Sequence, residues 1–491
     1  MSGSEKEKLN MPCTTLLAGK KITYDGSTMT ARNEDSGATG FCAKKFAVIH
    51  PSEQPKHYVS VLSHQEIDLP ENPMRYTAMP NAVDDEGIWG AAGVNEANVS
   101  MTATETITSN ERVLSADPLT KTVSQVKGTE EKPGGIGEED MVTLVLPYIH
   151  SAREGVKRLG SLLKEYGTYE MNGNAFQDEN EVWWLESIGG HHWIARRVPD
   201  DCYVAAPNSF GIDTFDLKDA YGKQKEHMCS DDLREFIAEN HLDLSLDGVF
   251  NARRAFGSHS DSDHVYNTPR AWFIQKYFNP SDTSIQPMDD DLPWCRKPEH
   301  KITVEDVKYV LSSHFQGTDY DPYSKHADPL KKGSFRPIGV NRNNFVSLVQ
   351  IRPDRDERIR TIEWVAFGSN VFNAFVPLYT QIDKAPEYIA NTSAKVTTEN
   401  FYWANRIIAA LADAQYGDTV SHIERYQNKI LSEGMRMIKE ADRKAAEEGF
   451  DPDQVNEEIV RFVKEETDQL LDRVLLTVSL KMKNGFARSD A

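Results

Sequence analysis

Short runs of apolar and β-branched residues, separated by turn residues, recur through the first 110 residues of the chain. They read TTLLAGKKI, STMTARN, KHYVSVLS and GIWGAAGVNEANVSMTATET, and a turn at Asp25-Gly26 separates the first two. Runs of this length and composition, bounded by glycine and aspartate, are typical of strands. The pattern therefore predicts a β-rich region over 13–110 and a hairpin made from its first two runs.

Beyond this region the hydrophobic period changes several times. Apolar residues recur at helical spacing over 138–167, and three strand-like runs follow, NEVWWLESIGG, HHWIARRV and CYVAAPNSF. FVSLVQIRP and TIEWVAFGS, with the charged DRDERIR between them, predict a second hairpin. The pattern is helical again from Glu399 onward. Residues 111–135 are polar, and KGTEEKPGGIGEED predicts an exposed loop. This order predicts an α+β fold or a layered αββα arrangement.

The excess of acidic over basic residues limits the kinds of molecule that the chain is expected to bind. The chain of 491 residues has 76 acidic against 55 basic residues, and no run rich in lysine or arginine. This argues against nucleic acid and anionic membranes as partners. No stretch reaches the roughly 18 consecutive apolar residues of a transmembrane helix. The first twelve residues, MSGSEKEKLNMP, lack the apolar core of a signal peptide. We therefore expect a cytoplasmic protein.

Cysteine and histidine spacing gives no sign of a metal centre. The five cysteines are scattered and form no C-x-x-C pair, which argues against a disulfide framework and a zinc site. SHSDSDH, at 258–264, lacks the glycine and final glutamate of an EF-hand and matches no zinc spacing. We expect a polar loop there, and no metal or organic cofactor. His191 and His192 begin a strand-like run, where neighbours point to opposite faces, so we expect them not to act together. The cysteines are Cys13, Cys42, Cys202, Cys229 and Cys295.

Cys13 lies near the start of the chain, and the closest histidine along the chain is His50. A thiol becomes a useful nucleophile when a base takes its proton or its pKa is lowered. Removal of residues 1–12 would make Cys13 the N-terminal residue. Its α-amine, with a typical pKa of ~7.7–8.0, could then act as the base. Arg32 could hold the thiolate, and Asp35 could hold the new α-ammonium. On spacing alone, a buried structural Cys13 beside a surface Arg-Asp pair stays open.

The stretch PCTTLLAGKKITYDGSTMTARNEDSG resembles the opening of the C69-type dipeptidases, which are cysteine peptidases of the N-terminal-nucleophile hydrolase superfamily. Further blocks occur in the family's order: WGAAGVNEANVSMTATET, WWLESIGGHHWIARRVPDDCYVAAPN, NTPRAWFIQKYFNP and IEWVAFGSNVFNAFVPLY. The resemblance covers roughly residues 13–400. A more distant similarity joins the family to penicillin V acylases and bile-salt hydrolases, which also begin with cysteine and have an R-N-x-D block.

The resemblance implies an αββα sandwich of two packed sheets flanked by helices. It also implies that Cys13 is the nucleophile and that its freed α-amine is the general base. Arg32 and Asp35 match the arginine and aspartate of the R-N-x-D block. Asn208, in AAPNSF, matches an asparagine of the distant acylases.

The resemblance matches two further positions, and at each of them a second residue remains possible. Asn95, in AGVNEAN, matches another asparagine of the acylases. Asn98 has the same side-chain amide and is an equally good candidate for this position. The side-chain amides of Asn95 and Asn208 would hold the oxyanion that forms during acyl transfer. Arg253 or Arg254, in FNARRAFG, corresponds to a later arginine of the acylases.

The implied activity is hydrolysis of small dipeptides through a thioester on Cys13. Two alternatives stay open: an amidase of the same superfamily that acts on non-peptide amides, and a non-catalytic relative that keeps the fold as an interaction surface. The chain divides into a removable extension at 1–12, a hydrolase domain at 13–398 and a helical region at 399–491. The sequence leaves open whether identical chains assemble into an oligomer.

Overall fold

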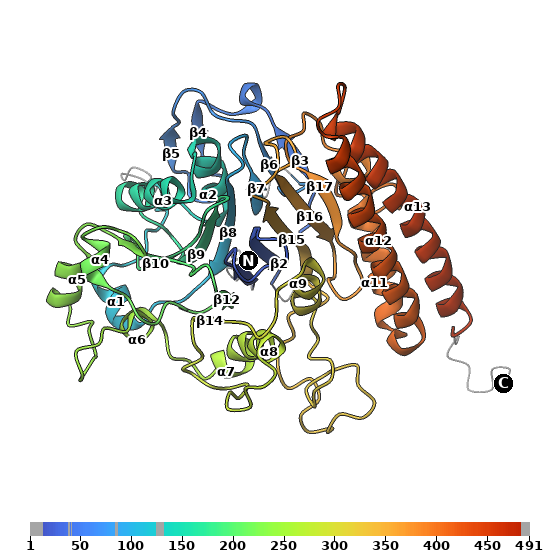
Figure 1. Ribbon diagram of the computed structural model, residues 1–491. Helices are drawn as coiled ribbons and strands as arrows, with labels where there is room; N and C mark the ends of the chain where they lie inside the picture. Colours follow the sequence, from blue (N-terminus) through green and yellow to red (C-terminus); the bar gives the residue numbers. More distant parts are fainter. Residues whose placement is uncertain (1–12, 38–39, 41, 84–86, 124–131, 483–491) are drawn as a thin grey trace, which may run out of the picture.

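The computed structural model describes residues 13–37, 40, 42–83, 87–123 and 132–482, and these form an α+β fold (Figure 1). Two large sheets supply most of the strands, and two small two-stranded sheets lie beside them. Neighbouring strands within each sheet pair antiparallel in every register that the structure defines. The predicted 1–12 extension lies outside the described residues.

The larger sheet has seven strands in the order β14-β12-β1-β2-β15-β16-β17, so β1 is an interior strand. Residues of β1, β2 and β15 are buried along their whole length, because both faces of the sheet are covered. The strands are β1 (Thr14–Ala18), β2 (Thr28–Asp35), β12 (Tyr203–Ala206), β14 (Cys295–Arg296), β15 (Asn343–Ile351), β16 (Thr361–Phe367) and β17 (Val376–Tyr379).

The second sheet has six strands in the order β13-β11-β10-β9-β8-β7. They are β7 (Ala92–Val94), β8 (Ser100–Thr106), β9 (Asn172–Gln177), β10 (Val182–Ile188), β11 (His192–Arg197) and β13 (His227–Cys229). The small sheets pair β3 (Ala47–Ile49) with β6 (Tyr76–Ala78) and β4 (His57–Val59) with β5 (Glu66–Asp68).

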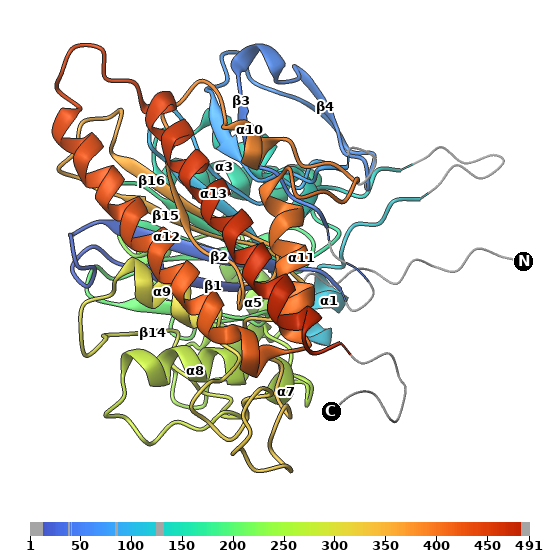
Figure 2. The same cartoon turned by 90° about the vertical axis from the view of Figure 1, so that its right-hand side faces the viewer.

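Helices cover the outer faces of the two large sheets. In Figure 1, α2 and α3 lie against the six-stranded sheet, while α12 and α13 lie beyond β16 and β17 of the seven-stranded sheet. Figure 2 shows α11, α12 and α13 in front of the strands of that sheet. The helices are α1 (Glu111–Ala116), α2 (Glu138–Val145), α3 (Ala152–Tyr166), α4 (Leu217–Ala220), α5 (Leu233–Glu239), α6 (Ala252–Phe256), α7 (Asp263–Tyr266), α8 (Thr268–Phe278), α9 (Val304–Leu311), α10 (Glu387–Ala390), α11 (Phe401–Asp413), α12 (Tyr416–Lys444) and α13 (Pro452–Ser479).

Alternation along β1 divides its side chains between two apolar cores. Leu16 packs with residues of α8, α9 and the C-terminal helices in the largest core. Leu17 packs with Trp184 and Val204 in the core that includes strands of both sheets. Because Cys13 and Leu17 share one face of the strand, Cys13 faces the six-stranded sheet.

The pattern predictions for the hairpins are confirmed. β1 pairs with β2 and β15 pairs with β16. In the first hairpin Gly26 has φ +81°, a backbone conformation that glycine adopts readily. The predicted helix over 138–167 is two helices, because Pro147 and the short 3₁₀ turn Leu146–Tyr148 interrupt it.

The exposed loop predicted over 127–140 is wrong at its end, because residues 134–140 are buried and 138–140 form the first turn of α2. The polar stretch before it contains a helix. Residues 111–116 form α1, with the Asn110 side chain accepting a hydrogen bond from the Val113 N–H as an N-cap. Residues 127–131 of the predicted loop lie outside the described residues.

The prediction that His191 and His192 do not act together is wrong. Both Nδ1 atoms contact the Asp117 carboxylate, at 2.9 Å and 2.7 Å. His191 belongs to the turn before β11, so strand alternation does not apply to it. Burial raises the pKa of Asp117, but hydrogen bonds from His192 and His191 outweigh burial and lower it to about 2.

The C-terminal helices share a core with the seven-stranded sheet. Trp364 of β16 and Tyr379 of β17 belong to the same apolar cluster as Tyr402, Ile423 and Val463 of the three helices. The helical region at 399–491 therefore covers one face of the sheet that contains β1, as far as residue 482.

Candidate active site

Pairing of β1 with β2 brings Cys13 next to Arg32. The register sets Thr14 opposite Asn33 and Thr15 opposite Arg32, and Cys13 immediately precedes β1. Arg32 Nη2 donates a hydrogen bond to Cys13 Sγ over 2.9 Å, and both residues are fully buried. A guanidinium in this position stabilises a negatively charged sulfur.

Arg32 is also part of a buried chain of alternating charges. Its Nη2 donates to Glu138 Oε1 at 2.6 Å, and its Nη1 lies 3.7 Å from Glu34 Oε2. Lys44 Nζ lies 3.0 Å from the other Glu34 oxygen. The four side chains are almost completely buried, and their formal charges cancel. Buried charges persist when they are paired in this way.

Glu138 is the first residue of α2, and all three acidic residues of its first turn are buried. The Asp140 carboxylate accepts the Gly137 N–H at 2.8 Å, which fixes the start of the helix. The Glu139 carboxylate accepts the N–H groups of 61 and 62 at 2.7 Å and 3.0 Å. Burial, followed by the charge of Glu139, raises the pKa of Asp140 to about 7. Glu139 and Asp140 therefore each bind a backbone group, whereas the carboxylate of Glu138 contacts Arg32.

Backbone carbonyls before β7 contact the same charge chain. Ala91 O accepts a hydrogen bond from Arg32 Nη1 at 3.3 Å, and Trp89 O accepts one from Lys44 Nζ at 3.2 Å. Trp89 and Ala91 have φ +49° and +64°. Such values cost a non-glycine residue ~1–3 kcal/mol and are concentrated at functional sites.

Asp35 lies on the opposite face of β2 from Arg32, since successive residues alternate. Its carboxylate accepts hydrogen bonds from Arg336 Nη2 and Asn343 Nδ2 and is fully buried. Asn343 stands opposite Asp35 in the β2–β15 register. The predicted contact of Asp35 with the α-ammonium of Cys13 stays a prediction, because it concerns the processed chain.

Asn208 follows β12, the other neighbour of β1. Continuing the β1–β12 register from Thr15 opposite Ala206 sets Asn208 opposite Cys13. Its Oδ1 accepts a hydrogen bond from Arg270 Nη2 at 2.8 Å. The structure therefore brings Asn208 to the end of the sheet where Cys13 lies.

Arg270 of α8 is a residue that the sequence analysis did not single out. Its Nη1 donates to the Cys13 carbonyl oxygen and, at 2.7 Å, to Thr14 Oγ1. Its Nη2 also donates to Asn267 Oδ1 at 2.6 Å. Arg270 is fully buried, so it fixes the backbone of Cys13 and the side chain of Asn208 together.

Arg253 and Arg254 lie elsewhere, on α6. Arg253 donates to the Gly211 carbonyl at 2.8 Å, and burial lowers the pKa of its guanidinium. Arg254 is exposed and forms a 2.9 Å ion pair with Asp291. Neither side chain has a described contact with Cys13, whereas Arg270 does. Of these three arginines, Arg270 is the one with a described contact to Cys13, through the carbonyl oxygen of that residue.

Asn95 is engaged by backbone groups of a turn. Its Nδ2 donates to the carbonyl oxygens of Leu146 and Ile149 at 2.8 Å and 2.7 Å. Its Oδ1 accepts the N–H groups of Ala97 and Val99 at 3.0 Å and 3.1 Å. Both amide hydrogens are thus used inside the protein, and this arrangement does not supply an oxyanion donor.

Asn98, the rival of Asn95, is similarly engaged. It donates to the Glu357 carbonyl at 3.2 Å and accepts the Thr361 hydroxyl at 2.7 Å. Its φ of +55° suits asparagine in a tight turn. The two asparagines close the β7–β8 connection, whereas the described contacts link Asn208 to Cys13 through Arg270.

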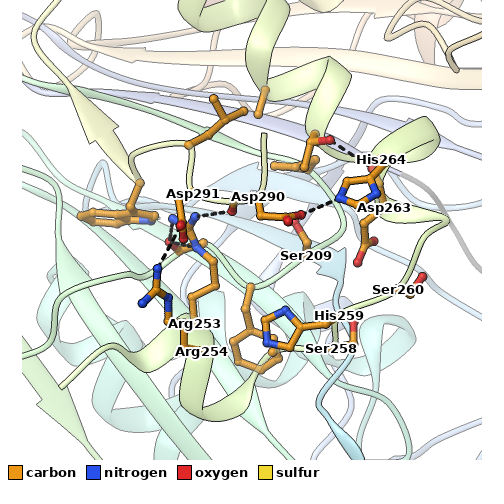
Figure 3. A pocket seen from close by; sticks show the side chains of 18 of the residues that line it. Ser209, Arg253, Arg254, Ser258, His259, Ser260, Asp263, His264, Asp290 and Asp291 are labelled. Atoms are coloured by element: carbon orange, nitrogen blue, oxygen red, sulfur yellow. Dashed lines mark hydrogen bonds and ion pairs between the residues drawn. The ribbon is translucent and has the colours of Figure 1, made fainter. Parts of the chain in front are cut away.

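A cavity of about 460 Å³ is lined by residues next to Asn208 and Arg270 in the chain (Figure 3). Its walls include Pro207 and Ser209, which flank Asn208 in the chain, and Ala271 of α8. The SHSDSDH segment contributes to the rim, and His264 contacts Asp290 at 2.6 Å. Cys13 and Arg32 do not line this cavity.

Two of the other described cysteines, Cys229 and Cys202, have thiols with a raised pKa, whereas a hydrogen bond with Cys202 lowers the pKa of Cys295. Burial raises the pKa of the Cys229 thiol to about 12. The neighbouring Cys295 thiol, together with burial, raises the pKa of Cys202. Thiols held protonated in this way are poor nucleophiles.

Two general features concern the described residues as a whole. Among them, no helix has both the length and the apolar character needed to cross a membrane. No three histidine, cysteine, aspartate or glutamate side chains of this part of the chain converge in an arrangement that could hold a metal ion.

The amino-acid sequence is similar to those of known proteins of one peptidase family. The sequence model of peptidase family C69 matches residues 12–429. The chain is 52% identical to a dipeptidase of Bifidobacterium longum (strain NCC 2705), over 98% of this chain and all of that protein. It is 51% identical to a probable dipeptidase A of Streptococcus pyogenes serotype M18 (strain MGAS8232), over 99% and 100%. It is 46% identical to dipeptidase A of Lactobacillus helveticus, over 88% of each chain.

Proposed function

This chain belongs to peptidase family C69, and we propose that it is a cysteine dipeptidase in which Cys13, once N-terminal, is the nucleophile. The observation that carries the proposal is the 2.9 Å hydrogen bond from Arg32 Nη2 to Cys13 Sγ. It supports a chemical role because a structural buried thiol needs no cationic donor. Residues 13–398 would form the hydrolase domain that contains the active site. The helices that follow from residue 399 would cover one face of its seven-stranded sheet.

The order of layers supports assignment to the αββα sandwich of the N-terminal-nucleophile hydrolases. Helices α2 and α3 flank one sheet, and α11–α13 flank the other (Figure 1). The nucleophile position immediately before the first strand of an interior hairpin is consistent with this fold.

The reaction begins with proton transfer. Cleavage before Cys13 frees its α-amine, which takes the thiol proton as general base. Arg32 stabilises the resulting thiolate, and Asp35 orients the α-ammonium. Sγ then forms a bond to the peptide carbonyl carbon of the dipeptide, and the carbonyl electron pair moves to oxygen.

The oxyanion is held by the side-chain amide of Asn208. Arg270 donates to Asn208 Oδ1, so the amide group is fixed with its NH₂ as the donor side. Collapse of the tetrahedral intermediate breaks the C–N bond, and the Cys13 α-ammonium protonates the departing amine. Water, deprotonated by the same α-amine, then hydrolyses the thioester and frees the thiol.

The chain with residues 1–12 attached has an amide nitrogen at Cys13 and lacks the proposed base. We therefore expect it to be inactive until processed. The test is to compare full-length protein with protein that begins at Cys13, verified by intact mass and N-terminal sequencing. The processed form should release amino acids from dipeptides, and iodoacetamide should abolish activity with its label on Cys13.

Two results would contradict this proposal. Full-length chain that hydrolyses dipeptides without cleavage would remove the α-amine from the mechanism. A processed chain that cleaves acylated amines but no dipeptide would favour the amidase alternative. Cys229→Ala is the matched control for Cys13→Ala, because both thiols are buried and only Cys13 contacts Arg32.

A further inference from the structure

We propose that Glu138 binds the α-ammonium of the substrate and so restricts the enzyme to peptides with a free amino terminus. This inference rests on the proposed function of Cys13. It adds a specificity-determining residue to the site, and it accounts for a carboxylate that the reaction steps above do not use. Glu138 reaches the site through Arg32, which it contacts over 2.6 Å.

Distances around one nitrogen atom place Glu138 within reach of the substrate. Arg32 Nη2 lies 2.9 Å from Cys13 Sγ and 2.6 Å from Glu138 Oε1. The sulfur and the carboxylate oxygen are therefore separated by no more than the sum of these lengths. Before reaction, the carbonyl carbon must approach the sulfur to about 3–3.5 Å. The α-nitrogen of the residue being acylated is two covalent bonds from that carbon, which is close enough to contact Glu138.

The charge of Arg32 makes a carboxylate necessary at this point. A dipeptide brings a positive α-ammonium into the neighbourhood of a buried guanidinium, and two like charges in a low-dielectric site repel strongly. The ammonium therefore needs an anionic partner nearby. Among the described residues, the buried carboxylates of Glu34 and Glu138 pair with Arg32.

Glu34 is the less suitable of the two. Lys44 Nζ lies 3.0 Å from its Oε1, and Asn344 Nδ2 donates to the same oxygen at 3.1 Å. The charge of Glu34 is thus balanced by a lysine of its own. Glu138 shares the charge of Arg32 with the Cys13 thiolate, so an additional cation improves the balance there.

Glu138 is fixed before substrate binds, because Arg32 holds its carboxylate and a backbone hydrogen bond holds its main chain. Glu138 begins α2, and its N–H donates to Glu170 Oε1 at 2.7 Å. A carboxylate has about four acceptor positions, so its hydrogen bond with Arg32 is compatible with an ammonium donor. A fixed acceptor avoids the entropy cost of ordering a mobile side chain.

The experiment compares two substrates on the processed enzyme. One is the dipeptide that the wild type cleaves fastest in a panel. The other is its des-amino analogue, in which hydrogen replaces the ammonium while the scissile amide is unchanged. The wild type should show a kcat/KM at least ~100-fold lower on the analogue, because a site built for a donor rejects a ligand that lacks it.

Glu138→Gln should remove this discrimination. We expect kcat/KM on the dipeptide to fall about 100-fold, since a buried charge loses its partner. On the des-amino analogue kcat/KM should fall much less, because only the contact with Arg32 is weakened there. Glu139→Gln is the matched control: it removes an adjacent buried carboxylate that contacts the backbone at 61–62, and it should keep the wild-type preference between substrates. If Glu138→Gln does not fold, Glu138→Asp should show a smaller loss confined to the dipeptide.

Several outcomes would overturn the inference. Equal losses on both substrates in Glu138→Gln would mean that Glu138 only positions Arg32. Equal wild-type rates on both substrates would mean that no ammonium is recognised, while hydrolysis through Cys13 still stands. A processed wild type that cleaves neither substrate refutes the proposed function itself, and the inference with it.

Discussion

Arg32 donates a hydrogen bond to the sulfur of Cys13, and neither side chain is exposed to solvent. Hairpin geometry alone produces this contact, because the β1–β2 register brings the two residues to one face of the sheet. The guanidinium is therefore the charge best placed to stabilise the thiolate, and its removal gives the most direct test of the site.

Arg32→Gln should lower the reactivity of Cys13 at neutral pH. Without the cation, the pH profile of iodoacetamide labelling at Cys13 should move upward by about one unit or more. Dipeptidase kcat should fall in parallel. Labelling of processed protein, followed over pH by mass spectrometry, measures the shift.

Arg254→Gln provides the control for this change, since Arg254 is exposed and pairs with Asp291. It should leave the labelling profile of Cys13 unaltered. An unchanged profile in Arg32→Gln would show that the hydrogen bond to sulfur does not govern thiolate formation.

Arg270→Met should reduce kcat far more than Arg253→Met does. The first variant removes donors from the Cys13 carbonyl, Thr14 Oγ1 and Asn208 Oδ1. The second removes bonds to the carbonyl oxygens of Gly211 and Asp290, two residues that line the 460 Å³ cavity. Steady-state kinetics of the two variants, at equal degrees of processing, decides between the arginines. A larger loss in Arg253→Met would reverse our assignment.

The sequence predicted the Cys13–Arg32 contact because a short hairpin makes it. Both residues belong to adjacent strands joined through a glycine turn, so local signals were sufficient. The contact of Arg32 with Glu138 joins residues 106 positions apart. No periodicity or turn rule relates strands to a helix at that separation, and Glu138 was therefore missed.

Arg270 could have been found from its own surroundings. It lies inside PRAWFI, where the neighbouring residues are apolar and buried in α8. A charge within such a run must be paired, because burial of an unpaired charge is costly. The adjacent arginines of FNARRAFG gave a more visible pattern, but α6 directs Arg254 to solvent and Arg253 to the Gly211 carbonyl.

Asn208→Ala and Asn95→Ala should affect different properties. Loss of one oxyanion donor in Asn208→Ala should lower kcat by about 10²–10³. Asn95→Ala should cost about 3 kcal/mol of unfolding free energy, because four backbone groups lose their partner. Urea unfolding and kinetics on the same preparations separate the two effects. A folded Asn95→Ala variant with a kcat as low as that of Asn208→Ala would restore Asn95 as an oxyanion donor.

Glu363 should make the stability of the protein depend on pH. It lies in β16, fully buried, and its Oε2 accepts a hydrogen bond from the Thr77 hydroxyl at 3.0 Å. Burial raises the pKa of Glu363 from 4.5 to about 7, although the bond from Thr77 lowers it. The folded chain therefore binds a proton more tightly than the unfolded chain does.

The sign of the effect follows from this difference. Below about pH 4.5 both states bind the proton, and the stabilisation is fully present. As pH rises through about 7 the stabilisation is lost, since the folded state must then bury an ionised carboxylate. For one such group the change is about 3 kcal/mol.

Glu363→Gln should flatten this dependence, because glutamine has a similar shape and no ionisation. Relative to the wild type, the variant should gain about 3 kcal/mol of unfolding free energy between pH 4.5 and pH 8. Urea unfolding followed by tryptophan fluorescence at a series of pH values measures the difference. Asp140 and Glu186, whose pKa values burial also raises to about 7, keep part of the slope in both proteins. Parallel stability curves for the two proteins would show that Glu363 has the same pKa in the folded and unfolded states, against the effect of burial.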